Sequence, residues 1–116
     1  ALRNDDFVYL HVEASDEAGH EGNIDLKIKT IEYLDARIVK PIFEEVSTWK
    51  EPVTIAILPD HPTPCAIKTH TNSPIPFVIY KPGKKADSVT VYDEFSARKG
   101  RYGLIKGAEF IKELID

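Results

Sequence analysis

Apolar residues recur at steps of three or four along residues 23–46, and this stripe lies between two short apolar runs. Its members are Ile24, Ile28, Ile31, Leu34, Ile38, Ile42 and Val46. Such steps place side chains on one face of a helix, so we expect a helix here. Pro41 lies within the stripe and lacks the N–H that a helix interior uses. It predicts a kink or break near Val39 and Lys40.

The two apolar runs have the length of strands. Residues 7–13 are almost continuously apolar, β-branched or aromatic, and residues 53–58 form the second run between two prolines. Runs of this kind are typical of strands covered on both faces. Residues 14–22, which contain two glycines, are expected to be the loop from the first strand into the helix. Strand, helix and strand then form a right-handed βαβ unit with parallel strands.

The rest of the chain completes the expected fold. Residues 77–80 and 89–92 are short apolar segments that favour a third and a fourth strand. Residues 108–115 suit a short terminal helix. The predicted fold class is therefore α/β, a partly parallel open sheet with flanking helices.

Size and composition exclude several classes of protein. The 116 residues allow one core, and 42% hydrophobic with 29% charged residues is an ordinary globular balance. The net charge is −4, and no basic cluster extends beyond Arg98, Lys99 and Arg101, which argues against nucleic-acid binding. No apolar run approaches the ~20 residues that span a bilayer. No signal peptide opens the chain, so we expect no membrane partner.

Cysteine and methionine usage bear on the origin of the chain. Cys65 is the single cysteine, so no internal disulfide can form, which suits a reducing cytoplasm. The chain has no methionine and opens Ala-Leu-Arg-Asn. We therefore expect residues 1–116 to be a single domain or a piece of something longer.

Five side chains of metal-binding type are expected at one edge of the sheet. In open parallel sheets, binding groups gather on loops that leave the carboxyl ends of the strands. Asp16 and His20 follow the first strand, Asp60 and His61 follow the second, and His70 precedes the third. Imidazole and carboxylate without thiolate suit a borderline divalent cation. Asp16, His20 and His70 would form one set with an open position for substrate, and Asp60 with His61 most of another.

A dense group of prolines supports this placement. Five of the eight prolines fall between residues 59 and 76, namely Pro59, Pro62, Pro64, Pro74 and Pro76. Proline fixes φ and removes a donor, so the segment is expected to be a stiff, irregular loop. An irregular backbone can turn adjacent residues such as Asp60 and His61 towards one cavity. Taken singly, each histidine is also consistent with a loop residue bonded to a carbonyl.

Other polar and small residues near this edge have different expected roles. Glu13, at the strand end, is expected to orient an imidazole from outside the ligand set. His11 lies inside the first strand, where we expect a buried, neutral histidine with a backbone partner. Cys65 is expected to fill a small buried space. Gly19 and Gly22 either bring the backbone close to a phosphate or metal or permit the turn into the helix.

Three motifs agree in order and spacing with one known family. They read His11-Val-Glu-Ala-Ser-Asp-Glu-Ala-Gly-His20, Asp60-His-Pro-Thr-Pro64 and Thr69-His-Thr-Asn-Ser-Pro-Ile-Pro-Phe77. Together they resemble the carboxyl-terminal part of the cofactor-independent phosphoglycerate mutases, in the alkaline phosphatase superfamily. The match covers essentially the whole chain. Pro62 stands where the bacterial branch usually has glycine, so the resemblance is to the archaeal-type branch.

The resemblance implies two divalent ions, as manganese, magnesium or zinc. Asp16, His20 and His70 occupy the positions that hold one ion, and Asp60 and His61 occupy two positions that hold the other. The family completes the second site with an aspartate and with the nucleophilic serine, both in an amino-terminal segment that this chain lacks. The serines present, Ser15, Ser73, Ser88 and Ser96, stand outside that motif context. We therefore expect no catalytic nucleophile in this chain. The expected partner is the missing amino-terminal part of the same protein.

The implied activity is the interconversion of 2- and 3-phosphoglycerate through a phosphoserine, a step of glycolysis in the cytoplasm. The fragment alone is expected to be inactive. Two alternatives stay open: a mutase-related homoserine kinase, which shares the motif residues, and a non-catalytic metal-binding or interaction module. An upstream coding sequence with the aspartate and the serine would separate the enzymes from the module.

Overall fold

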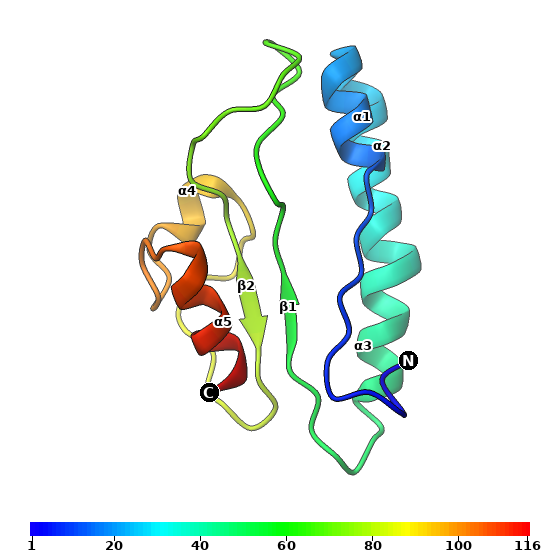
Figure 1. The fold of residues 1–116 in the computed structure, drawn as a ribbon, viewed down its shortest axis with the longest axis vertical. Coiled ribbons are helices and arrows are strands. Elements are labelled where there is room, and N and C mark those ends of the chain that lie inside the picture. Colours follow the sequence, from blue (N-terminus) through cyan, green and yellow to red (C-terminus); the bar gives the residue numbers. More distant parts are fainter.

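The computed structural model describes all residues, Ala1–Asp116, and places a long helical rod beside a small sheet with two short helices (Figure 1). An extended amino-terminal segment runs along the rod on the side that faces the sheet. The rod consists of α1 (Ala14–Glu21), α2 (Ile24–Leu34), a π-helical turn (Asp35–Val39) and α3 (Lys40–Val46). No helix is both long and apolar enough to cross a bilayer.

The helix predicted over residues 23–46 is confirmed, and so is its irregularity before Pro41. The side chain of Asn23 caps α2 by accepting a hydrogen bond from the Leu26 N–H at 3.0 Å. The Lys40 N–H donates to the Asp35 carbonyl, five residues earlier, which defines the π-helical turn. Pro41 follows directly and has no N–H to donate, so the rod changes its hydrogen-bond pattern where the proline enters.

The loop expected over residues 14–22 is wrong, because most of it is the helix α1. Its buried face consists of Ala18 and Gly19, which are too small to show as an apolar stripe in the sequence. The helix ends at Gly22, whose φ of 70° is left-handed and favours glycine. Asp16 and His20 therefore lie one turn apart on the same helix.

The sheet has two strands, β1 (Ile55–Ile57) and β2 (Val78–Tyr80), which confirms the strands predicted over 53–58 and 77–80 in shortened form. They pair antiparallel, with Ala56 opposite Ile79. The parallel βαβ unit is therefore not formed within this chain. Residues 7–13 form no strand and pair with neither β1 nor β2.

The fourth strand expected over residues 89–92 is also absent. This segment is attached through a side chain instead of a backbone ladder. The hydroxyl of Tyr92 lies 3.3 Å from the Ile57 carbonyl and 3.2 Å from the Pro76 carbonyl, next to both strands. Burial of that hydroxyl, with a smaller effect of the nearby Glu94 carboxylate, raises the pKa of Tyr92 to about 12.

Two helices complete the chain. The short α4 (Glu94–Ala97) was not predicted, and α5 (Gly107–Ile115) confirms the terminal helix. Phe110 of α5 packs edge-on against Phe77 at 5.3 Å between ring centroids, which fixes α5 beside β2. This contact forms one wall of a cavity described below.

Very little of the chain is buried. Five of 116 residues are buried, and the accessible surface is 9036 Å², against about 6,400 Å² for a compact domain of this mass. Leu10 is 59% exposed and Tyr9 is 72% exposed. The expectation that residues 7–13 are covered on both faces is thus wrong for this chain. The apolar side chains of the segment are exposed to solvent instead of being buried.

Candidate metal centre

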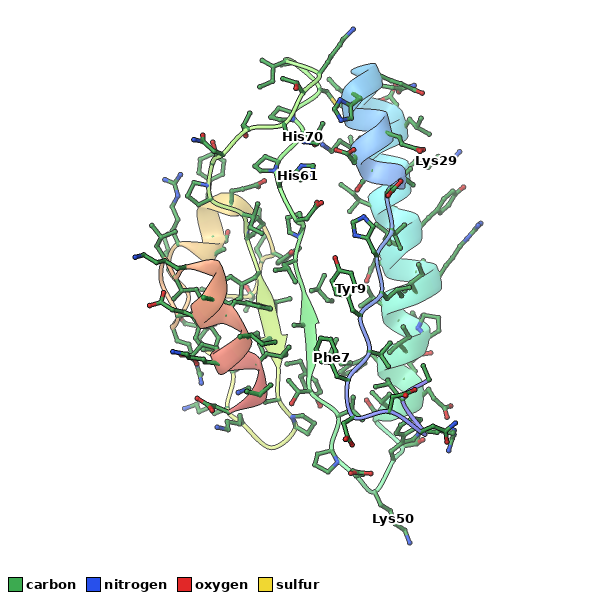
Figure 2. The ribbon with its side chains drawn as sticks, in the orientation of Figure 1. Phe7, Tyr9, Lys29, Lys50, His61 and His70 are labelled. Atoms are coloured by element: carbon green, nitrogen blue, oxygen red, sulfur yellow. The ribbon has the colours of Figure 1, made fainter.

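Five side chains of metal-binding type meet where α1 lies against the loop of residues 59–76. They are Asp16, His20, Asp60, His61 and His70. Figure 2 shows His61 and His70 on the loop beside the upper end of the rod. The spatial convergence expected from the sequence is therefore present, although it arises between a helix and a loop and not at the edge of a parallel sheet.

The first group joins α1 to the end of the loop. One turn of helix separates Asp16 from His20, and the Oδ2 of Asp16 lies 3.3 Å from the Nε2 of His20. The Nε2 of His70 lies 3.3 Å from the Oδ1 of Asp16 and 3.0 Å from the Nε2 of His20. Three potential ligand atoms, from residues up to 54 positions apart, thus face one another.

The second group adjoins the first. The His61 N–H donates to the Oδ1 of Asp60 at 3.0 Å, and the Nε2 of His61 lies 3.1 Å from the Oδ2 of Asp60. The rings of His61 and His70 lie 3.7 Å apart between centroids. Ligand atoms of Asp16, His61 and His70 lie within 4.8 Å of one another. The two expected sets therefore form one continuous cluster.

The chemistry of this donor set fits a divalent cation. The Nδ1 of His20 lies 3.0 Å from the Lys68 carbonyl oxygen, which can only accept, so this nitrogen carries the proton. The Nε2 of His20 then presents a lone pair towards Asp16 and His70. Lone pairs and carboxylate oxygens at such distances repel unless a proton or a metal cation lies between them. Nitrogen and oxygen donors without thiolate suit manganese, zinc or magnesium.

Asp16 is held in the ionised form that a metal ligand needs. The hydrogen bond from the Thr63 hydroxyl is the largest cause that lowers the pKa of the Asp16 carboxyl, against a smaller opposing effect of burial. The protonated forms of His20, His70 and His61 lower it further through their positive charge. Asp16 is therefore a carboxylate throughout the physiological range.

Thr63 is a residue of this site that was not predicted from the sequence, whereas Gly19, already a candidate for a close backbone approach, lies against the loop and not against a phosphate or metal. Thr63 is 4% exposed, and its hydroxyl contacts both Asp16 and the Nδ1 of His61, the latter at 3.2 Å. A Cβ on Gly19 would lie 2.4 Å from the Thr63 carbonyl oxygen, so this glycine permits close approach of helix and loop. The one feature of the sequence that could have indicated a role for Thr63 is its place as a polar residue between Pro62 and Pro64.

Three expectations near the cluster are corrected or qualified. Glu13 does not reach it: the Glu13 carboxylate lies 3.7 Å from the Nε2 of His11 and bonds to none of the candidate ligands. His11 is exposed and not buried, because its segment is uncovered, and its Nδ1 lies 3.3 Å from the Tyr9 hydroxyl. Cys65 is free and half-buried, so it fills space only in part.

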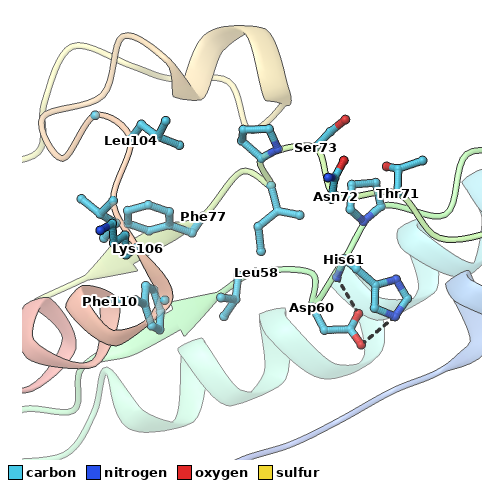
Figure 3. A pocket seen from close by; sticks show the side chains of 16 residues that line it. Leu58, Asp60, His61, Thr71, Asn72, Ser73, Phe77, Leu104, Lys106 and Phe110 are labelled. Carbon is cyan, nitrogen blue, oxygen red and sulfur yellow. Dashed lines mark hydrogen bonds and ion pairs between the residues drawn. The ribbon is translucent and has the colours of Figure 1, made fainter.

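A cavity of about 340 Å³ opens beside Asp60 and His61. Figure 3 shows Thr71, Asn72 and Ser73 on the side near His61, and Phe77, Leu104 and Phe110 on the other. The hydroxyl oxygen of Thr71 is buried there without a hydrogen-bond partner. Such an orphaned group is costly unless a ligand or solvent pairs with it. The cavity can thus hold a polar small molecule next to the cluster.

A family profile described as the Metalloenzyme superfamily matches residues 1–114. The chain belongs to this superfamily. A metalloenzyme assignment and a cluster of nitrogen and oxygen donors both point to divalent metal binding.

Proteins similar to this chain are considerably longer. A "2,3-bisphosphoglycerate-independent phosphoglycerate mutase" of Methanosarcina mazei is 52% identical over 116 residues, which are 99% of this chain and 29% of that protein. A protein of the same name from Methanosarcina barkeri is 51% identical over 98% of this chain and 29% of its own length. A "probable" one from Geobacter sulfurreducens is 44% identical over 100% of this chain and 29% of its own.

A solved structure shows that the fold recurs in a larger protein. The PH0037 protein from Pyrococcus horikoshii superposes with a TM-score of 0.91 at 36% identity. The match covers 99% of this chain and 34% of that one. The present arrangement of rod, loop and small sheet is therefore found as one part of a longer protein chain.

Proposed function

We propose that this chain is the carboxyl-terminal part of the alkaline phosphatase-like domain of a longer 2,3-bisphosphoglycerate-independent phosphoglycerate mutase. Its similarity to proteins of that name, each about three and a half times as long, supports the proposal. The convergence of Asp16, His20, Asp60, His61 and His70 at one end of α1 carries it. A cytoplasmic location belongs to the same proposal, since a lone free cysteine suits a reducing compartment.

In this proposal the cluster holds two divalent ions, as manganese, magnesium or zinc. Asp16, His20 and His70 hold one, and Asp60 and His61 contribute two ligands to the other. When bound, the ions supply the positive charge that stabilises a transferring phosphoryl group. The short distances between Nε2 atoms and carboxylate oxygens within the cluster support this division.

The nucleophile is proposed to lie in the remaining part of the longer protein. Ser15 adjoins Asp16 in sequence, and Ser73 lines the cavity beside Asp60 and His61. No hydrogen bond joins either hydroxyl to a histidine or carboxylate that would activate it. The role of this chain is then to hold and orient the ligands, and to offer the cavity with Thr71 to the substrate.

The partly parallel open sheet belongs to the longer protein in the same proposal. Residues 7–13 are extended, β-prone and exposed, as a strand without its neighbours would be. Strands from the rest of the protein would pair with this segment and extend the sheet beyond β1. This would also cover part of the excess apolar surface.

An assay on the longer protein tests the function. The wild type should convert 3-phosphoglycerate in an enolase-coupled assay, and Asp60→Asn and His61→Ala should each lower turnover about a hundredfold or more. Their unfolding midpoints should stay close to the wild type, because both residues lie on a loop. Asp5→Asn, at an exposed position that forms no side-chain hydrogen bond or ion pair in this chain, is the matched control and should leave turnover unchanged.

The same experiment separates the alternatives. If 3-phosphoglycerate is inert while homoserine with ATP yields phosphohomoserine, the kinase replaces the mutase. If neither substrate reacts but divalent ions still bind, the non-catalytic module is the correct reading. The 116-residue chain alone should show no mutase or phosphatase turnover, and robust turnover lost on chelation would place a nucleophile within it.

A further inference from the structure

We propose that Thr63 is a positioning residue whose single hydroxyl orients both groups of candidate ligands. The inference rests on the metal centre proposed above. Thr63 lies on the loop between two prolines and is 4% exposed, so its hydroxyl can pair only with groups in its immediate surroundings. Those groups are Asp16 of the first set and His61 of the second.

The direction of each hydrogen bond follows from the number of protons. An ionised carboxylate only accepts, so the Thr63 hydroxyl donates its one proton to the Oδ1 of Asp16. The hydroxyl oxygen can then only accept further hydrogen bonds, through its lone pairs. The Nδ1 of His61 lies 3.2 Å from this oxygen, so a hydrogen bond between them requires the proton on Nδ1. Thr63 therefore favours the tautomer of His61 that is protonated on Nδ1, against the pull of the Asp60 carboxylate on Nε2.

This tautomer determines what the second set offers. The Nε2 of His61 carries the lone pair and faces the Oδ2 of Asp60 at 3.1 Å, so two acceptors point at one region. A cation shared between them satisfies both. In the first set, the same hydroxyl occupies the Oδ1 of Asp16 and leaves Oδ2 directed at the Nε2 of His20. The Thr63 side chain thus orients one candidate ligand in each set, Asp16 in the first and His61 in the second.

The position of Thr63 is itself fixed from several sides. The Lys27 ammonium of α2 donates to the Thr63 carbonyl at 2.6 Å. Gly19 of α1 leaves room for that carbonyl where any side chain would collide with it. The Thr71 N–H donates to the neighbouring Pro62 carbonyl at 3.1 Å, which ties the two arms of the loop together. These contacts hold the Thr63 hydroxyl in one position relative to Asp16 and His61.

The first test reads the tautomer in the metal-free chain by long-range proton–nitrogen NMR at about pH 8, above the ordinary histidine pKa of about 6.5. His61 is assigned from the signals missing in His61→Ala. Wild type and Thr63→Ser, which keeps the hydroxyl, should show His61 protonated on Nδ1. Thr63→Val, which keeps the shape, should lose that preference. Protonation on Nε2 in the wild type would overturn the proposal, even if the valine variant failed to fold.

The second test measures affinity for manganese and zinc by calorimetry. Thr63→Val should weaken binding by about ten- to a hundredfold, whereas Thr63→Ser should stay within a few-fold of the wild type. Thr69→Val, at an exposed threonine of the same loop, should bind as the wild type does. Equal affinity of the valine variant would contradict the role of Thr63. If the wild type binds neither ion, the metal centre fails, while the tautomer measurement still decides whether Thr63 orients His61.

Discussion

Gly19 lies directly against the carbonyl group of Thr63, and a Cβ at position 19 would lie 2.4 Å from that oxygen. The glycine belongs to the turn of α1 that carries His20, and Thr63 contacts both Asp16 and His61. The close approach of α1 and the loop is thus possible only because position 19 has no side chain. Since the candidate ligands lie on both sides of this contact, it sets their spacing.

Gly19→Ala should force α1 and the loop apart. Overpacking of this kind costs about 1–3 kcal/mol, to be measured as the free energy of unfolding in urea. Affinity for manganese should fall as well, because Asp16 and His20 move away from His61 and His70. Gly107→Ala is the matched control, since a Cβ there meets nothing within 4 Å. A Gly19→Ala variant as stable as the wild type would show that the loop yields at little cost.

The chain should bind at least one divalent ion without the rest of the protein. Asp16, His20 and His70 all come from these residues, so titration with manganese or zinc should give a measurable isotherm. His20→Ala should abolish it, and chelation should reverse binding in the wild type. His11→Ala removes an exposed imidazole outside the cluster and should change nothing. An isotherm unaffected by His20→Ala would remove this residue from the site.

Tyr92 should make stability sensitive to alkaline pH. Its pKa is raised from 10.0 to about 12 by burial of the hydroxyl, so folding favours the neutral phenol. The stability that Tyr92 contributes is therefore complete below about pH 10 and is lost as the pH rises through about 12. Tyrosinate absorbance should show one phenol that titrates late, and Tyr92→Phe should remove it.

The same substitution should lower the free energy of unfolding at neutral pH by about 1 kcal/mol, the usual contribution of one hydrogen bond. Tyr33→Phe, at a tyrosine of α2 whose hydroxyl forms no hydrogen bond, is the control and should leave both the late titration and the stability intact. If the late phenol persists in Tyr92→Phe, a different tyrosine is responsible.

Hydrogen exchange should distinguish this chain from the longer protein. In the isolated chain the amides of residues 7–12 have no ladder partners and should exchange rapidly. In the intact protein the same amides should be protected, because we propose that neighbouring strands pair with them. Amides of α2 serve as an internal reference and should be protected in both. Protection of residues 7–12 in the isolated chain would contradict the unpaired arrangement.

The elements that could be predicted from the sequence are those whose signal is local. The apolar stripe predicted the helix of residues 23–46, and Pro41 marked its irregular turn. By contrast, α1 was hidden because small residues, Ala18 and Gly19, make its buried contact. Residues 7–13 have the composition of a strand, but pairing depends on a neighbour that composition does not reveal.

The candidate site divides in the same way. The convergence of the aspartates and histidines was predicted from their expected places at the carboxyl ends of parallel strands. They do meet, but between α1 and the loop of residues 59–76, because the two strands of the chain are antiparallel. Thr63 was not singled out, since a threonine between two prolines has many ordinary roles. Its importance arises from two hydrogen bonds to residues 47 and 2 positions away, which only the folded chain displays.

The π-helical turn of Asp35–Val39 has a consequence for insertions and deletions. A π-helix takes about one residue more per turn than an α-helix, and one residue corresponds to about 100° of rotation. The turn therefore sets the direction in which α3 points its side chains, including Phe43, whose ring lies 5.1 Å from that of Tyr80 in β2. Removing a single residue between 35 and 39 would convert this stretch into a regular α-helical turn and leave α3 facing the sheet, whereas removing one residue from α2 would rotate the preceding part of the rod by about 100° relative to α3. The π-helical turn is thus the place in the rod where the loss of one residue can be absorbed.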